Sequence, residues 1–406
     1  MKSFEVPIIY RSPLISAIKK KRKEMDKMKK DFSPTLLDFG PLRIYLARHF
    51  GFCYGVENAI EIAFRTVDEN PGKRIFLLSE MIHNPQVNAD LQSHGVTFLQ
   101  DTYGNQLVPF EELRADDVVI IPAFGTTIEI EKQLSAIGIP TEKYNTTCPF
   151  VEKVWNRSEA IAKKQYSIVI HGKPNHEETR ATFSHAALNA PSVVVKDMKE
   201  TEELAKYITG EKQAWQFFEE FKGQHSEGFD PVAHLQRIGV VNQTTMLASD
   251  TQEIADYLKQ VMLQKYGIGT IEEHFADTRD TLCYATLDNQ SAVTGMLGAN
   301  ADLAIVVGGY NSSNTSHLVE LCEEKVPTYF ISNEDKILSR KDILHYDIHG
   351  NQEILTSNYL PLKDTATILI TSGASCPDAI VEAVIKKLTG FFPLEKTTEE
   401  VIEQFR

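Results

Sequence analysis

Residues 51–63 read GFCYGVENAIEIA, and two later stretches of the chain begin in a similar way. They are TTCPFVEKVW at 146–155 and TLCYATLDNQSAV at 281–293. A polar cluster follows each cysteine at a similar distance: His83 lies 30 residues after Cys53, His176 lies 28 after Cys148, and Ser312 lies 29 after Cys283. A regular recurrence of this kind is typical of one structural unit that is used three times.

The repeated unit is predicted to be a helix, a strand and a loop. After each cysteine comes an amphipathic stretch, then a short β-branched run, then a turn rich in Gly, Asn, His or Ser. A second strand and loop follow in DVVIIPAFGTT at 117–127, RIGVVNQTTML at 237–247 and ATILITSGASCPD at 366–378, each before a further helical pattern. Alternating strands and helices predict an α/β fold with parallel sheets. Because ligands bind at the carboxyl ends of such strands, we expect the loops of the three units to share one centre.

The composition is that of a globular protein. The 406 residues are 42% hydrophobic and 24% charged, and the length suggests two to three domains. No apolar run approaches the ~18 residues of a membrane span, and the net charge of −14 argues against nucleic acid as the main partner. Five cysteines in a chain without an apolar signal segment favour the reducing cytoplasm.

The first 31 residues carry the opposite charge to the remainder of the chain. They hold ten Lys or Arg and four Asp or Glu, and they include KKKRK at 19–23. Charge runs are usually exposed, so we expect a solvated helix or a tail. The functional alternative is a docking surface for an acidic electron carrier.

The cysteines divide into two classes. We interpret Cys322 as a small buried hydrophobe and Cys376 as a thiol that lines a pocket without acting. Cys53, Cys148 and Cys283 each precede a predicted helix, whose dipole favours a thiolate. Three thiolates that meet would bind zinc or an iron–sulfur cluster. Without a Cys-x-x-Cys pair, spacing leaves two alternatives open: a closed zinc site with a fourth ligand such as His176, or a four-iron cubane with one open iron.

The strand-end loops resemble an anion cradle. Small polar donors occur there together with glycines that permit close backbone approach, and GGYNSSN and GASCPD each lie between a strand and a helix, where backbone N–H groups face an anion. The donors are His83, His176, Ser312, Ser313, Asn314 and Ser375, and the glycines are Gly125, Gly308, Gly309 and Gly373. In HEE at 176–178, His176 and Glu178 could relay a proton, and Thr244 and Thr245 could extend that relay or simply cap a helix.

In this order, GFCYGVENAIE, TTCPFVEKVW, HEE, NQTTM, CYATLDNQ, NSSN and GAS-x-PD resemble the LytB-type 4-hydroxy-3-methylbut-2-enyl diphosphate reductases. The resemblance runs from about Leu42 to about Leu388. It implies a trefoil of three α/β domains around a central iron–sulfur cluster. It also implies reductive dehydroxylation of that allylic diphosphate to isopentenyl and dimethylallyl diphosphate, the last step of the non-mevalonate isoprenoid pathway.

The resemblance also assigns residues. By this likeness, Cys53, Cys148 and Cys283 would hold a [4Fe-4S] cluster. Glu178 would deliver the proton through His176, with support from Thr244. The diphosphate would be bound by His83, His176, Thr244, Ser312, Ser313, Asn314 and Ser375. A ferredoxin-type or flavodoxin-type protein would supply the electrons.

The chain departs from the short bacterial pattern in three places. Where that pattern has a second diphosphate-binding His, this chain reads PAFG with Phe124, as does the longer cyanobacterial and chloroplast branch. It also has a basic extension at its beginning and an insertion at about 199–235. The predicted parts are the extension at 1–41, α/β units at 42–147, 148–282 and 283–388, and a tail at 389–406.

Two non-enzymatic alternatives complete the predictions. One is a scaffold stabilised by zinc, which would explain the cysteines but would leave Glu178 and the polar loops without a purpose. The other is a phosphate-ligand-binding protein with a degraded catalytic centre, which the presence of all three cysteines and Glu178 argues against.

Overall fold

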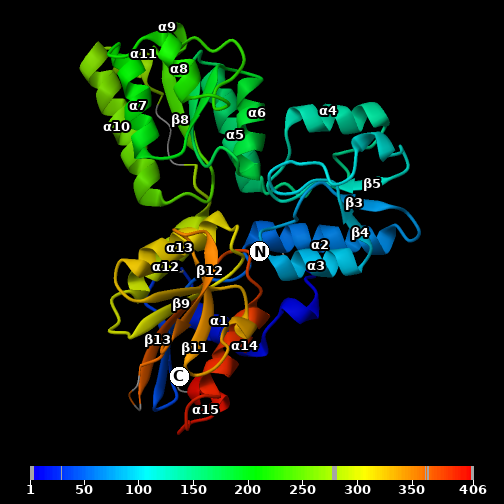
Figure 1. Cartoon of the computed structure of the whole chain (residues 1–406), viewed down its shortest axis with the longest axis vertical. Helices are drawn as coiled ribbons and strands as arrows, with labels where there is room; N and C mark the ends of the chain where they lie inside the picture. The colour runs from blue at the N-terminus through cyan, green and yellow to red at the C-terminus, as the bar shows by residue number, and fades with distance from the viewer. Residues whose placement is uncertain (1–3, 29, 277–280, 362, 364, 404–406) are drawn as a thin grey trace. The chain divides into compact units, whose positions relative to one another are not determined.

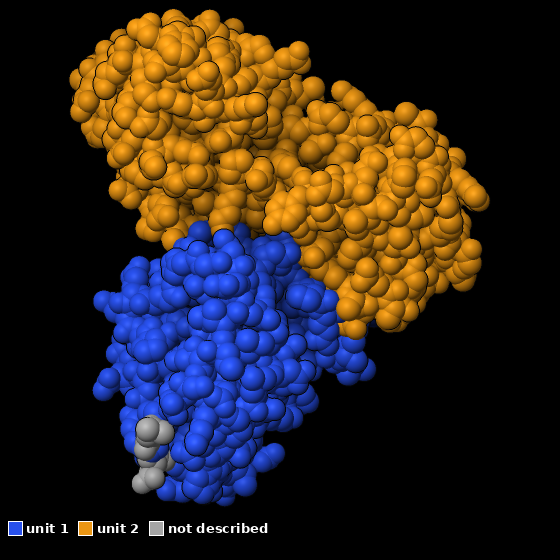
Figure 2. All heavy atoms as spheres, in the orientation of Figure 1, with its two compact units in different colours: residues 1–57, 83–86, 284–406 blue, residues 58–82, 87–283 orange. Residues whose placement is uncertain are grey.

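The structure is a computed structural model that describes residues 4–28, 30–276, 281–361, 363 and 365–403. The chain forms two compact units (Figure 2). Unit 1 contains residues 1–57, 83–86 and 284–406, and unit 2 contains residues 58–82 and 87–283.

Unit 1 is built on a seven-stranded sheet in which β1 and β2 are combined with the five strands β9 to β13 (Figure 1). In spatial order its strands are β1 (Thr35–Asp38), β2 (Leu42–Leu46), β13 (Ala366–Ser372), β9 (Leu303–Val307), β10 (Thr328–Ile331), β11 (Asp342–Asp347) and β12 (Gln352–Ser357). The four strands from β2 to β10 run parallel, whereas β1, β11 and β12 are antiparallel to their neighbours. Ile44, Ile305 and Ile368 on the parallel strands are fully buried, so these strands form the centre of the core.

Helices complete unit 1. They are α1 (Pro13–Met25), α12 (Tyr284–Met296), α13 (Ser313–Glu323), α14 (Asp378–Thr389) and α15 (Thr398–Glu403), with short 3-10 turns η1 (Ile8–Tyr10) and η3 (Glu334–Lys336). α13 contacts β9, β10 and β13, and it follows the loop at the carboxyl end of β9. The helix therefore positions that loop against the parallel part of the sheet.

The basic N-terminal segment is more integrated than the expected solvated helix or tail. Ser12 caps α1 by accepting a hydrogen bond from the Ile15 N–H at 2.9 Å. Ile15 and Ile18 are buried in the core, and α1 packs against α14. Lys19 forms a 2.7 Å ion pair with Asp378 of α14. The segment is therefore an amphipathic helix, which its many cationic residues made difficult to recognise in the sequence. The isoleucines lie on one face, and the cationic groups reach polar partners or solvent.

This packing predicts that α1 contributes to the stability of unit 1. Ile15→Ala removes a side chain that is fully buried, and it should destabilise unit 1 by roughly 2–5 kcal/mol. A lower urea midpoint, followed by circular dichroism, would show this. Lys20→Ala, on the exposed side of the same helix, is the matched control and should leave the midpoint unchanged. Equal midpoints for all three proteins would contradict the buried role of α1.

Unit 2 contains two three-stranded parallel sheets. The first has the order β4-β3-β5, with β3 (Ile75–Leu77), β4 (Val96–Phe98) and β5 (Val118–Ile120). Its helical elements are α2 (Tyr54–Glu69), which begins in unit 1, α3 (Pro85–Ser93), η2 (Phe110–Glu112) and α4 (Ile128–Ile137). Phe76, Val119 and Leu134 share one buried cluster, so α4 packs on this sheet.

The second sheet of unit 2 has helices on both faces. Its order is β7-β6-β8, with β6 (Ser167–His171), β7 (Ser192–Val195) and β8 (Ile238–Asn242). The helices are α5 (Pro149–Ala162), α6 (Glu177–Ala187), α7 (Met198–Thr209), α8 (Ala214–Glu220), α9 (Pro231–His234), α10 (Ala248–Tyr266) and α11 (Ile271–His274). Ile168 and Ile170 pack with Val154 of α5, whereas Val169 packs with Leu204 of α7. Alternate residues of β6 therefore serve opposite faces.

The insertion predicted at about 199–235 is helical and partly buried. It contains most of α7 together with α8 and α9. α7 packs against α10, and Phe217 of α8 is fully buried in the same cluster. Part of this segment is thus the crossover from β7 to β8 and belongs to the core of unit 2.

The prediction of an α/β fold with parallel sheets is confirmed. The six expected strands are β3, β5, β6, β8, β9 and β13, and helices follow all three cysteines. We keep the three-unit division as a proposal for domains, with β1 and β2 added to the third sheet. Among the residues that the structure describes, no helix combines the length and the apolar character that a membrane crossing requires.

Candidate active site

The polar loops of unit 1 meet at the ends of two adjacent strands. β9 and β13 run parallel with Val307 beside Ser372, so their carboxyl ends lie at the same edge. GGYNS at 308–312 follows β9 and leads into α13, and GASCP at 373–377 follows β13 and leads into α14. This arrangement brings two of the predicted anion-binding loops together.

The first of these loops is organised by a helix cap. Ser312 caps α13, and its hydroxyl oxygen accepts hydrogen bonds from the Thr315 N–H at 3.3 Å and the Thr315 hydroxyl at 2.9 Å. Ser313 and Asn314 form the first turn and are buried, with 3% and 4% of their surface exposed. The positive end of the α13 dipole therefore lies beside these polar side chains.

Asn314 connects the two loops. Its Oδ1 accepts a hydrogen bond from the Ala374 N–H at 2.9 Å, and Asn289 Nδ2 lies 3.5 Å from the same oxygen. In the described part of the chain, the buried Asn314 Nδ2 has no hydrogen-bond acceptor. A buried donor of this kind is costly unless a ligand or water satisfies it, so it is available for an anion.

His83 and Cys53 are tied to the loop after β13. The Ser375 hydroxyl donates to the His83 carbonyl at 3.1 Å. The Cys53 N–H donates to the Ala374 carbonyl at 3.2 Å. The residues from 83 to 86 belong to unit 1. One network of hydrogen-bonded loops therefore contains Cys53 and five of the predicted anion-binding residues. These five are His83, Ser312, Ser313, Asn314 and Ser375.

Close packing around Gly309 yields a prediction for ligand binding. A Cβ atom at this position would lie 2.3 Å from the His83 carbonyl oxygen, so Gly309→Ala must separate the two loops. A shift of about 1 Å in a binding group can cost about 10²-fold, and we expect the KM for a diphosphate substrate to rise at least ~10-fold. Steady-state kinetics would measure it. Gly298→Ala is the control, because its nearest neighbour is the Gly295 carbonyl oxygen at 3.7 Å; an equal KM for the two variants would contradict the argument.

Unit 2 holds a buried carboxylate at the ends of β6 and β8. Glu178 is 1% exposed and lies in the first turn of α6. Its Oε1 accepts the Thr244 N–H at 2.5 Å, and its Oε2 accepts the Thr244 hydroxyl at 2.9 Å. β6 and β8 are parallel neighbours with His171 beside Asn242, which brings the two loops together. One threonine therefore fixes both oxygens of the carboxyl group.

His176 begins the helix that carries Glu178. Its Nδ1 accepts the Glu178 N–H at 3.2 Å, so the ring caps α6. The proton of a neutral His176 therefore resides on Nε2. The Phe124 ring meets the His176 ring edge-on, with 5.7 Å between centroids and an interplanar angle of 86°. Phe124 thus packs beside a predicted site residue and offers no hydrogen-bond donor there.

Cys148 and Cys283 lie near this carboxylate. The Cys283 N–H donates to the Thr244 carbonyl at 3.3 Å. Cys148 immediately precedes α5, and its N–H donates to the Ala123 carbonyl at 2.9 Å. Burial raises the pKa of the Cys148 thiol to about 12, and negative charge on Cys283 and Glu178 adds to the rise. For Cys148, burial therefore outweighs the helix dipole that was expected to favour a thiolate.

The predicted site residues thus form two clusters. Unit 1 brings Cys53 together with five anion-binding candidates, and unit 2 brings Cys148 and Cys283 together with His176, Glu178 and Thr244. Within the described residues, neither unit alone gathers three ligating side chains for a metal ion. The five cysteines, all within the described residues, form no disulfide; Cys322 and Cys376 are buried, and the other three are half-buried.

Several supporting residues were not identified from the sequence. Gln243 accepts hydrogen bonds from the Thr179 hydroxyl and the Lys173 N–H, which joins the loops after β6 and β8. Asn242 Oδ1 accepts hydrogen bonds from the N–H of Thr281 at 3.1 Å and from the Thr281 hydroxyl at 2.5 Å. Thr281 lies two residues before Cys283. Adjacency to the NQTTM and TLC motifs was the only available signal, because side-chain contacts across loops are not visible in a linear pattern.

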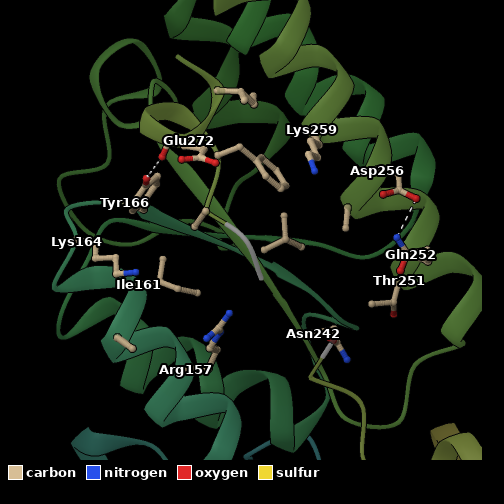
Figure 3. Close-up of a pocket in the computed structure, with 16 residues that line it drawn as sticks. Arg157, Ile161, Lys164, Tyr166, Asn242, Thr251, Gln252, Asp256, Lys259 and Glu272 are labelled. Carbon is tan, nitrogen blue, oxygen red and sulfur yellow. Dashed lines mark hydrogen bonds between the residues drawn. The ribbon is translucent and has the colours of Figure 1, made fainter. Parts of the chain in front are cut away.

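A cavity of about 940 Å³ in unit 2 contains none of the predicted site residues (Figure 3). It lies among α5, β8, α10 and α11. Arg157, Lys164 and Lys259 bring positive charge to its wall, while Asp256 and Glu272 bring negative charge. Mixed charge gives no preference for an anion, so this cavity does not compete with the strand-end loops as a diphosphate site.

The fold and these clusters define an α/β protein whose strand-end loops carry cysteine thiols, small polar donors and a buried carboxylate. The chain belongs to the LytB protein family, whose model matches residues 44–389. The family resemblance predicted from the motifs is therefore confirmed.

Similar proteins carry a consistent name. The chain is 41% identical over 352 residues to the 4-hydroxy-3-methylbut-2-enyl diphosphate reductase of Picosynechococcus sp., covering 86% of this chain and 84% of that one. It is 41% identical to the protein of the same name from Microcystis aeruginosa, covering 87% and 86%. The solved structure of the E-1-hydroxy-2-methyl-but-2-enyl-4-diphosphate reductase from Plasmodium falciparum is 21% identical with a TM-score of 0.62, covering 89% of this chain and 97% of that chain. That likeness shows a shared fold.

Proposed function

We propose that the protein is a 4-hydroxy-3-methylbut-2-enyl diphosphate reductase that forms isopentenyl and dimethylallyl diphosphate. The names of its relatives support this function. The observation that carries it at the site is the buried Glu178 carboxyl group, held through both oxygens by Thr244 beside Cys148 and Cys283. A buried acid in a fixed orientation is suited to delivering one proton to one atom.

The cysteines fit the proposed [4Fe-4S] cofactor. In the described residues, Cys53, Cys148 and Cys283 form no disulfide, and each immediately precedes a helix. Soft thiolates favour iron–sulfur clusters, and a thiol with a pKa raised to about 12, such as Cys148, needs a bound cation to hold it deprotonated at neutral pH. When bound, the cluster would supply the two electrons of the reduction.

The proposed reaction breaks the allylic C–O bond. It consumes two electrons and two protons and releases water. Glu178 would give one proton to the leaving oxygen through His176. The two hydrogen bonds from Thr244 would hold the Glu178 carboxyl group in a fixed orientation during this transfer. The second proton would go to carbon at either end of the allyl group, which accounts for two products.

The loops of unit 1 would bind the diphosphate. Support comes from the α13 helix end, the available Asn314 amide donor and the buried serines. These donors are neutral, so the anion would be held by dipoles and hydrogen bonds. We propose a ferredoxin-type or flavodoxin-type protein as the electron donor and the cytoplasm as the location.

Purification without oxygen tests this function. A brown protein with absorbance near ~400 nm and about four irons per chain, active on the diphosphate with a reduced donor, would support the proposal. A colourless protein with stoichiometric zinc after attempted cluster reconstitution would favour a zinc scaffold and would withdraw the roles of His176 and Glu178. A loaded protein without turnover would instead point to phosphate-ligand binding.

A further inference from the structure

His317 is a buried histidine without a role in the proposed reaction. It lies on α13 (Figure 1), four residues after Ser313, and is 5% exposed. Residues four apart share one face of a helix, and helical side chains lean toward the N-terminus. The His317 ring therefore extends toward the first turn of α13, where the diphosphate is proposed to bind.

Two hydrogen-bond partners fix the orientation of this ring. Nδ1 lies 2.7 Å from Oε2 of Glu320, and Nε2 lies 3.5 Å from the Ser313 hydroxyl oxygen. An ionised carboxylate can only accept a hydrogen bond, so Nδ1 carries a proton. Nε2 is thereby directed at the Ser313 hydroxyl oxygen, 3.5 Å away.

The state of Nε2 decides what Ser313 can do. If Nε2 has no proton, it accepts the Ser313 hydroxyl hydrogen and withdraws that donor from a ligand. If Nε2 carries a proton, it donates to the Ser313 oxygen, and the hydroxyl hydrogen is released toward an anion. An anion that accepts the Ser313 hydroxyl hydrogen therefore favours the arrangement in which Nε2 donates to the Ser313 oxygen.

We infer that His317 is a positioning residue that turns the Ser313 hydroxyl toward the substrate diphosphate, with Glu320 holding its ring. The inference rests on the proposed function, because it takes Ser313 as a diphosphate donor. His317 would act on the substrate through Ser313 and without contacting it.

The test compares His317→Leu with His317→Gln, whose amide can still donate to Ser313. We expect the KM for the allylic diphosphate and the Kd for inorganic diphosphate to rise about tenfold in His317→Leu, with kcat within about twofold because only binding is affected. His317→Gln should recover part of both losses. His345→Gln is the matched control: His345 is another buried histidine of unit 1, hydrogen-bonded to Thr356 on the distant strand pair β11 and β12.

A second readout follows the ring itself. On addition of inorganic diphosphate, the ¹⁵N signal of His317 Nε2 should move to the value of a protonated nitrogen, and a signal that stays unprotonated overturns the inference. Unchanged KM and Kd in His317→Leu also overturn it, as does a parallel loss of kcat and binding in all three variants. If the wild type fails to reduce the substrate but loses diphosphate affinity in His317→Leu, the proposed reaction fails and the role of His317 stands.

Discussion

Glu178→Gln should lower kcat by at least ~10²-fold, which is the contribution typical of a general acid, while the iron and sulfide content stays at the wild-type level. The amide cannot release a proton to a leaving oxygen. The fold around it should survive, because the glutamine oxygen can still accept the Thr244 N–H and the Thr244 hydroxyl can turn to accept from the new NH₂ group. Single-turnover kinetics on the cluster-loaded variant would isolate the chemical step.

The control for this result is Glu177→Gln, the same change one residue earlier. Glu177 is also buried, at 6% exposure, but it is hydrogen-bonded to the Ser79 hydroxyl. Its variant should retain far more turnover than Glu178→Gln. If Glu178→Gln keeps wild-type kcat with a full cluster, Glu178 is not the proton donor, and a comparable loss in both variants would point to general disturbance of α6.

Cys148→Ala should remove the cluster and with it all turnover above background. Cys148 is the residue that immediately precedes α5, and its thiol lies near Glu178 and Cys283. A cubane held by three protein thiolates would lose one of them. We expect the absorbance near ~400 nm to disappear and the iron content to fall well below about four per chain. Anaerobic reconstitution followed by iron and sulfide analysis measures this.

Cys322→Ala is the matched control for the cysteine change. Cys322 is fully buried within α13 and packs in the core of unit 1, so its loss should affect stability and leave the cluster intact. The comparison separates ligation from packing, since both variants remove one sulfur atom. A Cys148→Ala protein that keeps a full, active cluster would remove Cys148 from the ligand set.

Local patterns in the sequence were sufficient to predict the strands and helices around the site. β9 and β13 were visible as β-branched runs before GGYNSSN and GASCPD, and both end where the polar residues begin. The pairing of β2 with β13 was not predictable, because it joins segments more than 300 residues apart and no local pattern specifies such a partner. The burial of α1 was missed because its lysines dominated the composition.

The candidate site shows the same limit. The motif order pointed to Glu178 and Thr244, and the structure brings these two residues into contact. The motif order did not indicate that Asn289 approaches Asn314 or that His317 faces Ser313. Asn289 was not distinguished from its neighbours in CYATLDNQ, and His317 lies outside the NSSN motif. Such contacts depend on which helix faces meet, and helix packing is set by the whole unit.

The sheet of unit 1 has a consequence for synthesis on the ribosome. β1 and β2 are translated before both sheets of unit 2, whereas β13, the central partner of β2, is translated after them. The loop that accepts the Cys53 N–H follows β13 directly. One edge of nascent β2 therefore stays unpaired until β13 has been synthesised. Unpaired strand edges are prone to aggregation and are bound by chaperones. Both sheets of unit 2 lie between these segments in the sequence and can pair earlier, so the contact between Cys53 and the loop after β13 should form after these two sheets.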